Sequence, residues 1–308
     1  MKNYGGVKGL CLLFFFSLEL FSDIKDIEIF PRVYEKSDIR GITILDAKTV
    51  HFKKRSGMKF SEISALAYSA EKGLYALSDN GYLFNLSIEL RNKKIQNLTL
   101  NKAMTLKTKK GNVLKHNDAE GMAFSQKGLI VSFERDPKVT LFDFDAHKIK
   151  DFPLPPVLKK INNYQKKNRA LESLVVHPVF GLITAPEAPL KHEDKKLHTL
   201  YSMNKRWKFK ANGKITSMEV MPDRNLLILE REFSYFSGHS ITLTKLDLRG
   251  CEKGLCSHKT LASLKSSKGW ELDNFEGLTH IKDNLYLMIS DDNENFMQKC
   301  IVVLFEVI

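Results

Sequence analysis

The feature that most constrains the fold of this chain is an internal repeat of about fifty residues. Each copy has an acidic residue, a short apolar strand, a turn rich in Gly, Asn, Asp or Pro, and a second apolar strand closed by another acid. Such a pattern predicts a β-hairpin in every copy. The opening acids are Glu62, Glu120, Glu172, Glu219 and Glu276, and the closing acids are Asp79, Glu134, Glu187, Glu230 and Asp291.

Copies of this length with several short strands are typical of a β-propeller. We therefore predict an all-β propeller with five blades, or with six if one of the longer intervals holds a degenerate blade. Residues 300–307 supply a third strand for the last copy and leave no sequence for a fourth. The strand-like segment 39–52 belongs to no copy, so its pairing with the last blade would close the ring and cover exposed strand edges. A β-sandwich is the alternative, but it does not require the same acid in five hairpins.

The first 22 residues differ in character from the rest of the chain. Lys2 and Lys8 precede an apolar run, 10–16, and a polar stretch begins at Asp23. This order is typical of a secretory signal peptide, and the run is shorter than the roughly 20 residues that span a bilayer. We expect a signal peptide over 1–22, with an uncleaved anchor as the alternative. A single propeller domain over 23–308 would then be periplasmic or secreted, without stable membrane insertion after cleavage.

Cysteine spacing and charge add further expectations. Cys251 and Cys256 are close enough to form a disulfide in an oxidising compartment, with free thiols or a metal site as alternatives. The formal net charge of +12 fits a solvated basic surface or a rim that attracts anions. We expect no nucleic-acid partner, because the lysine clusters lack the interleaved aromatic residues that bind single strands.

The hairpin geometry predicts that the acids gather at one mouth of the channel. The start of one strand and the end of its antiparallel neighbour lie at the same end of a hairpin, and all blades of a propeller share one orientation. Crowded carboxylates raise each other's pKa, so arginines such as Arg135, Arg169 and Arg231, or a divalent cation, must compensate them. Calcium, which accepts six to eight oxygen ligands, is the predicted cation. Alternatively, the acids accept backbone hydrogen bonds and only hold the ring together.

Four short motifs carry a resemblance to a known family. They are Asn-Asp-Ala-Glu-Gly-Met-Ala at 117–123, Asn-Phe-Glu-Gly-Leu at 274–278, Ser-Asp-Asn-Gly at 78–81 and Ser-Asp-Asp-Asn at 290–293. On these residues the chain resembles the bacterial phytase-like propeller family, whose members are described as having esterase-like activity, over about residues 58–308. The resemblance implies an exported hydrolase of phosphate or carboxylic esters. The third and fourth copies depart from the pattern, with Glu-Ser-Leu and Glu-Val-Met in place of Glu-Gly.

If the chain is a hydrolase, its substrate is a small phosphorylated or ester compound, and the site is built from the acids and arginines of the mouth. The expected calcium ligands are Asp118, Glu120, Glu276, Asp291 and Asp292. The expected catalytic residues are Glu120, Glu276, Arg135 and Arg231, with the arginines stabilising developing negative charge. A serine mechanism lacks support, because no Gly-x-Ser-x-Gly motif is present. The competing hypothesis is a non-catalytic periplasmic propeller that binds a ligand or a protein at the acidic mouth.

Overall fold

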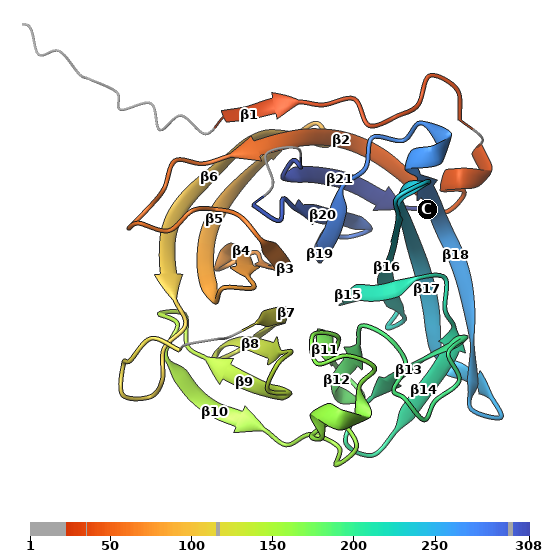
Figure 1. Cartoon of the computed structure of the whole chain (residues 1–308). Coiled ribbons are helices and arrows are strands. Elements are labelled where there is room, and N and C mark those ends of the chain that lie inside the picture. The colour runs from red at the N-terminus through yellow and green to blue at the C-terminus, as the bar shows by residue number, and fades with distance from the viewer. Residues whose placement is uncertain (1–22, 35, 115–117, 295–297) are drawn as a thin grey trace, which may run out of the picture.

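The computed structural model describes residues 23–34, 36–114, 118–294 and 298–308. These residues form antiparallel sheets around a common centre (Figure 1) and three short 3-10 helices, η1 (Lys36–Ile39), η2 (Ile161–Asn163) and η3 (Ser266–Lys268). The segment expected to be a signal peptide, 1–22, lies outside the described residues. No helix in the described part of the chain is long and apolar enough to cross a membrane.

The strands follow one another in up-and-down groups, which we call units 1 to 5. Unit 1 contains β3 (Ile63–Ser69), β4 (Gly73–Ser78), β5 (Tyr82–Arg91) and β6 (Lys94–Thr105). Unit 2 contains β7 (Ala119–Ser125), β8 (Gly128–Phe133), β9 (Lys138–Phe142) and β10 (Lys148–Phe152). Unit 3 contains β11 (Leu171–His177), β12 (Gly181–Pro186), β13 (Leu197–Tyr201) and β14 (Arg206–Lys210). Unit 4 contains β15 (Lys214–Val220), β16 (Leu226–Ser234), β17 (Gly238–Glu252) and β18 (Leu255–Lys265).

Unit 5 joins the two ends of the described chain and closes the ring. It contains β19 (Asn274–Lys282), β20 (Leu285–Asp291) and β21 (Ile301–Val307), with β2 (Ile42–His51) as its next strand and β1 (Asp23–Asp26) on the outer edge. β2 pairs antiparallel with β21, which confirms the predicted closure by the N-terminal strand. The pairing satisfies backbone groups that would otherwise form an open edge.

The first strand of each unit lies nearest the centre of the ring (Figure 1). Each of these inner strands contacts the next, from β3 through β7, β11 and β15 to β19, and β19 contacts β3 again. The propeller architecture is therefore confirmed. Units 3 and 4 pair into one eight-stranded sheet through a parallel bridge between Lys208 and Leu255. The preference for five blades over six consequently stays a prediction.

The core lies between neighbouring units, and this explains the strand sequences. β8 and β20, the second strands of units 2 and 5, are buried along their whole length, because another unit packs on each face. Their sequences are accordingly near-continuous apolar runs. The outer strand β14 alternates instead, with Trp207 and Phe209 buried and Arg206, Lys208 and Lys210 exposed. The apolar runs that predict the hairpins are thus the runs that fill the spaces between units.

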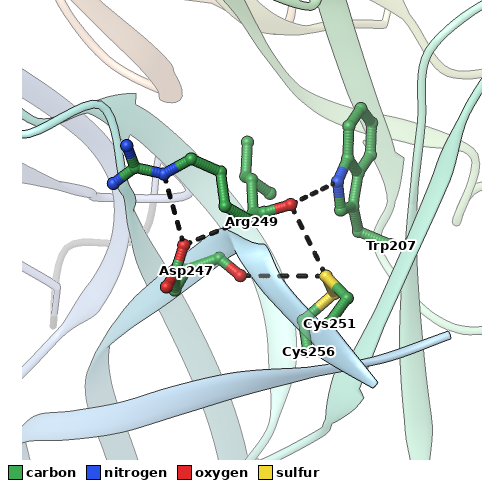
Figure 2. The surroundings of a disulfide bond; sticks show 6 residues. Trp207, Asp247, Arg249, Cys251 and Cys256 are labelled. Atoms are coloured by element: carbon green, nitrogen blue, oxygen red, sulfur yellow. Dashed lines mark hydrogen bonds and ion pairs between the residues drawn. A yellow bond between two sulfur atoms is a disulfide. The ribbon is translucent and has the colours of Figure 1, made fainter. Parts of the chain in front are cut away.

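A disulfide joins Cys251 and Cys256 near the tip of the β17–β18 hairpin (Figure 2). The two residues face each other in the ladder between these strands. Beside them, Trp207 of unit 3 donates a hydrogen bond of 3.0 Å from Nε1 to the carbonyl oxygen of Leu248. The disulfide therefore stabilises the part of β17 and β18 against which Trp207 of unit 3 packs.

We expect the double substitution Cys251→Ser and Cys256→Ser to lower the free energy of unfolding by about 2 kcal/mol, because the bridge restricts a short loop of the unfolded chain. Guanidinium denaturation monitored by tryptophan fluorescence measures the change. Dithiothreitol should destabilise the parent protein by a similar amount and leave the double variant unchanged. An identical denaturation midpoint for parent and double variant would contradict the prediction.

Candidate functional site

A β-bulge at the start of the inner hairpin recurs in every unit and sets the side chains that surround the channel. In each unit the register between the first and second strands shifts at the same place. A bulge leaves one residue unpaired and re-aims its side chain. The residues at the bulge are Ser64, Glu120, Glu172, Thr216 and Glu276. Three of the five predicted opening acids therefore occupy equivalent positions.

The other two opening acids, Glu62 and Glu219, are placed differently. The prediction that Glu219 lies at the same mouth as the other opening acids is wrong. Glu62 precedes β3 at the same mouth, where its backbone N–H donates to Asp292. Glu219 lies near the far end of β15, and its carboxylate accepts a hydrogen bond of 3.1 Å from the backbone N–H of His280. Because β15 begins at Lys214, Thr216 and not Glu219 takes the bulge position. The fourth opening acid is thus at the opposite end of its strand.

The closing acids form a second set, again with one exception in unit 4. Asp79, Glu134, Glu187 and Asp291 all follow or end the second strand at the mouth. In unit 4 the equivalent position belongs to Arg231, which pairs with Lys214. The predicted closing acid Glu230 precedes it and is fully buried. There it accepts hydrogen bonds from the Asn212 backbone N–H and the Thr244 hydroxyl, at 2.7 Å each, which attach the connection between β14 and β15 to unit 4.

Three carboxylates converge in unit 2. One oxygen of each of Asp118, Glu120 and Glu134 lies within 4.8 Å of the others. Asp118 precedes β7, Glu120 occupies its bulge, and Glu134 follows β8, so the first hairpin of the unit brings all three together. Arg135 forms an ion pair with Asp118, and its side chain is largely exposed. We call Asp118, Glu120 and Glu134 the acidic cluster.

The acidic cluster shares its mouth with other acids that raise its pKa values. Burial, followed by the charges of Asp118 and Glu187, raises the pKa of Glu134 to about 8. Burial also raises the pKa of Glu120, with the charge of Glu276 as the next cause. Protons or a cation must therefore compensate these carboxylates near neutral pH.

The remaining predicted ligands lie outside the acidic cluster. Glu276 forms an ion pair of 3.1 Å with Nη2 of Arg231 and accepts a hydrogen bond of 2.9 Å from Asn274. Asp291 accepts a second hydrogen bond from the same amide group, at 3.1 Å. Asp292 accepts the backbone N–H of Glu62 at 3.1 Å. The structure thus brings the five predicted metal ligands to one mouth, and of these five Asp118 and Glu120 belong to the acidic cluster.

The sector of the mouth between units 3, 4 and 5 is basic and hollow. Lys214 and Arg169 both contact the Glu187 carboxylate, at 2.8 and 3.3 Å. With Lys195 and Arg231, they line a pocket of about 1130 Å³. Glu232 is the acidic residue of its lining. In this sector the cations of units 3 and 4 therefore lie beside carboxylates, with Arg169 and Lys214 on Glu187 and Arg231 on Glu276.

Two functional candidates were missed by reasoning from the repeat alone. Glu134 was predicted as a closing acid but not as a metal ligand, and Lys214 was not predicted at the mouth. Glu134 follows Phe133, which pairs with Ala119, the residue after Asp118. The register between β7 and β8 would therefore have predicted that Glu134 lies opposite Asp118. Lys214 lies two residues before the bulge of β15, as Asp118 lies two residues before the bulge of β7. The same register therefore predicts that Lys214 lies at the mouth.

Comparison with known proteins identifies the family. The family model described as phytase-like, esterase-like activity of phytase, matches residues 58–294, which is most of the chain. The chain belongs to the phytase-like family. This confirms the resemblance seen in the Asp-Ala-Glu-Gly and Asn-Phe-Glu-Gly motifs. No curated protein matches the chain.

Solved structures similar to this phytase-like chain include several propellers and enzymes. The β-propeller domain of Myceliophteria thermophila Cps50 (Swd1) matches at 10% identity and a TM-score of 0.43, covering 93% of this chain and all of that one. The PQQ-bound aldose sugar dehydrogenase of Streptomyces coelicolor matches at 10% identity and a TM-score of 0.42, covering 87% and 98%. A luciferin-regenerating enzyme matches at 10% identity and a TM-score of 0.41, covering 80% and 92%. None of these similarities bears on activity.

Proposed function

We propose that this phytase-like propeller is an exported, metal-assisted hydrolase of phosphate or carboxylic esters. The observation that carries the proposal is the position of the acidic cluster, at the same channel mouth as a large pocket with several cations. A cation site beside a basic pocket suits a substrate with an anionic or polarised oxygen. Membership of a family described by esterase-like activity supports the same reaction class.

The acidic cluster fits a hard divalent cation such as calcium. Calcium binds oxygen ligands at about 2.3–2.6 Å, so two ligands of one ion lie within about 5 Å of each other. The separations within 4.8 Å among Asp118, Glu120 and Glu134 meet this condition. We propose these three residues as the metal ligands. When bound, the ion supplies Lewis-acid polarisation of a phosphoryl or carbonyl oxygen and lowers the pKa of water.

The chain's own residues supply charge stabilisation and proton transfer. Burial raises the pKa of Glu276 to about 7, while the adjacent Arg231 opposes the shift. A carboxyl with this pKa can hold and release a proton near neutral pH, as a general acid or base must. Arg231 at the pocket and Arg135 beside Asp118 are placed to stabilise developing negative charge.

Hydrolysis of p-nitrophenyl phosphate, phytate and p-nitrophenyl butyrate, each with calcium and with EDTA, tests the proposal. We expect turnover of at least one ester with calcium and little with EDTA. Turnover that is unchanged by EDTA would reject metal assistance, and no turnover of any ester would reject the hydrolase.

Mass spectrometry of the protein tests the proposed export. We expect cleavage of the signal peptide near residue 22.

Stability without metal should depend on pH. Glu134 has a pKa raised from 4.5 to about 8 in the folded state. Between these values the folded protein holds a proton that the unfolded chain has lost, so stability falls as pH rises through this range. Thermal melts in EDTA and in calcium measure the effect. We expect a clear fall in EDTA, a smaller fall in calcium, and a shallower slope in EDTA for Glu134→Gln, whereas equal slopes in all samples would contradict the prediction.

A non-catalytic binding propeller is the second candidate, and the ion pairs at the mouth favour it. Asp118, Glu187 and Glu276 each already contact a cationic side chain. Carboxylates paired in this way can fix the shape of a binding surface without taking part in a reaction. Ligand binding without turnover of any of the three esters would support this function over hydrolysis.

A further inference from the structure

Unit 4 differs from the other units where its inner hairpin reaches the mouth. β16 has nine residues, whereas β4, β8 and β12 have six each and β20 has seven. The additional length carries Arg231 at the position that is acidic in every other unit, and it ends in an aromatic turn. Residues two apart on a strand share a face, so Arg231 and Phe233 point to the same side. Both line the pocket, as does Tyr235 in the turn.

The aromatic residues of this hairpin form one wall of the pocket. The ring of Phe233 lies 5.6 Å from that of Tyr235 and 4.8 Å from that of His239, its partner across the ladder. Tyr235 is 95% exposed and Phe233 is 52% exposed, so neither ring fills the core. Exposed aromatic rings at the rim of a pocket are suited to stacking against a flat ligand.

Three polar atoms of pocket residues are buried without a hydrogen-bond partner in the described part of the chain. They are Nε of Arg231, Nδ1 of His239 and Oδ1 of Asn274. Asn274 is only 3% exposed, and its amide nitrogen donates to both Glu276 and Asp291, which fixes Oδ1 as the unused acceptor. Unpaired buried polar groups are costly, so a ligand that offers both acceptors and donors is favoured here.

The charge of the pocket defines the ligand further. Arg169, Lys195, Lys214 and Arg231 contribute four cations to its lining. The carboxylates beside them are Glu232 in the lining, Glu187 on Arg169 and Lys214, and Glu276 on Arg231, so one positive charge remains in excess. Arginine and lysine at such a site favour phosphate, phosphonate or carboxylate groups. The aromatic wall lies on the same hairpin as Arg231, so an anionic group held by Arg231 leaves its substituent near Phe233 and Tyr235.

We propose that this pocket binds an organic anion with a flat aromatic group, the anionic group at Arg231 and Lys214 and the ring against Phe233 and Tyr235. Resting on the proposed function, this inference narrows the substrate class to phosphate esters of aromatic alcohols. The binding claim itself needs no reaction. Its test is therefore independent of turnover.

Isothermal titration calorimetry with two phosphonates, in EDTA, tests the pocket. Phenylphosphonate and methylphosphonate carry the same anionic group on a carbon–phosphorus bond that the proposed reaction does not cleave. We expect phenylphosphonate to bind about twofold to tenfold more tightly than methylphosphonate, the range for one aromatic contact. Phe233→Ala and Tyr235→Ala should remove this preference, and Arg231→Gln should weaken both ligands about tenfold.

Phe236→Ala is the matched control, because Phe236 is a fully exposed aromatic residue of the same turn and does not line the pocket. It should bind both phosphonates like the parent protein. Equal affinity for the two phosphonates, no binding of either, or the same loss in F236A as in Y235A would overturn the inference. Turnover of phenyl phosphate is measured in parallel. Tighter binding of phenylphosphonate without turnover of phenyl phosphate supports the pocket and rejects the hydrolase. Turnover without tighter binding of phenylphosphonate supports the hydrolase and rejects the pocket.

Discussion

Glu120→Gln is expected to lower calcium-dependent ester hydrolysis by about a hundredfold or more, since the metal is proposed to supply several kcal/mol of charge stabilisation. Glu120 belongs to the acidic cluster, and the bulge of β7 fixes its position beside Asp118 and Glu134. The amide keeps the size of the side chain and removes its charge. We therefore expect weaker calcium binding as well as slower turnover, measured by the calcium-induced shift in melting temperature and by initial rates.

Glu172→Gln is the matched control for this experiment. Glu172 occupies the equivalent bulge in β11, and it is a buried carboxylate that interacts with Glu120 through charge. It lies outside the acidic cluster. We expect a small change in rate and a retained response to calcium. Equal losses in both variants would show that only the total charge of the mouth matters, and unchanged activity in Glu120→Gln would reject the proposed site.

Gly128→Ala is expected to destabilise the fold by about 4 kcal/mol, because backbone strain and overpacking act together. Gly128 begins β8 with φ of +145°, a region that residues with a Cβ rarely adopt. A Cβ there would overlap the carbonyl oxygen of Phe142 and lie 2.9 Å from its carbonyl carbon. Both obstacles are backbone, so no side chain can move aside. Denaturation with guanidinium measures the loss.

The matched control is Gly181→Ala, at the corresponding start of β12 in unit 3. Gly181 has φ of +69°, and a Cβ there meets no atom within 4 Å. We expect a loss of about 1 kcal/mol, the ordinary cost of the left-handed conformation. Losses of similar size at the two positions would show that the close approach of β9 to β8 does not constrain the hairpin of unit 2.

Much of the architecture could be predicted because its signals are local. Apolar runs such as 285–291 and turn residues such as Gly73 and Gly128 mark each hairpin without reference to distant residues. Closure of the ring by the strand-like segment 39–52 could also be predicted, because the last copy lacked a fourth strand and this segment belonged to no copy. These predictions need only counting and periodicity.

The register of unit 4 could not be predicted in the same way. Glu219 resembles an opening acid in sequence, yet it lies near the end of β15, and Glu230 lies one residue before the position taken by Arg231. A bulge absorbs a residue without a mark in the sequence, and a slip of one residue turns a side chain to the other face. Only pairing with the neighbouring strand fixes which residue faces the channel.

By itself, the sequence determined the hairpins, the repeated strands and the family, because these depend on residues that are near one another along the chain. The tertiary structure alone decided that Glu134 joins Asp118 and Glu120, and that Arg231, Asn274 and His239 meet in one pocket. Those groups come from different strands and units, and their distances depend on bulges, strand lengths and ring closure. Charge and hydrogen bonding act over a few ångströms, so the chemistry of the mouth is set by packing that no local pattern encodes.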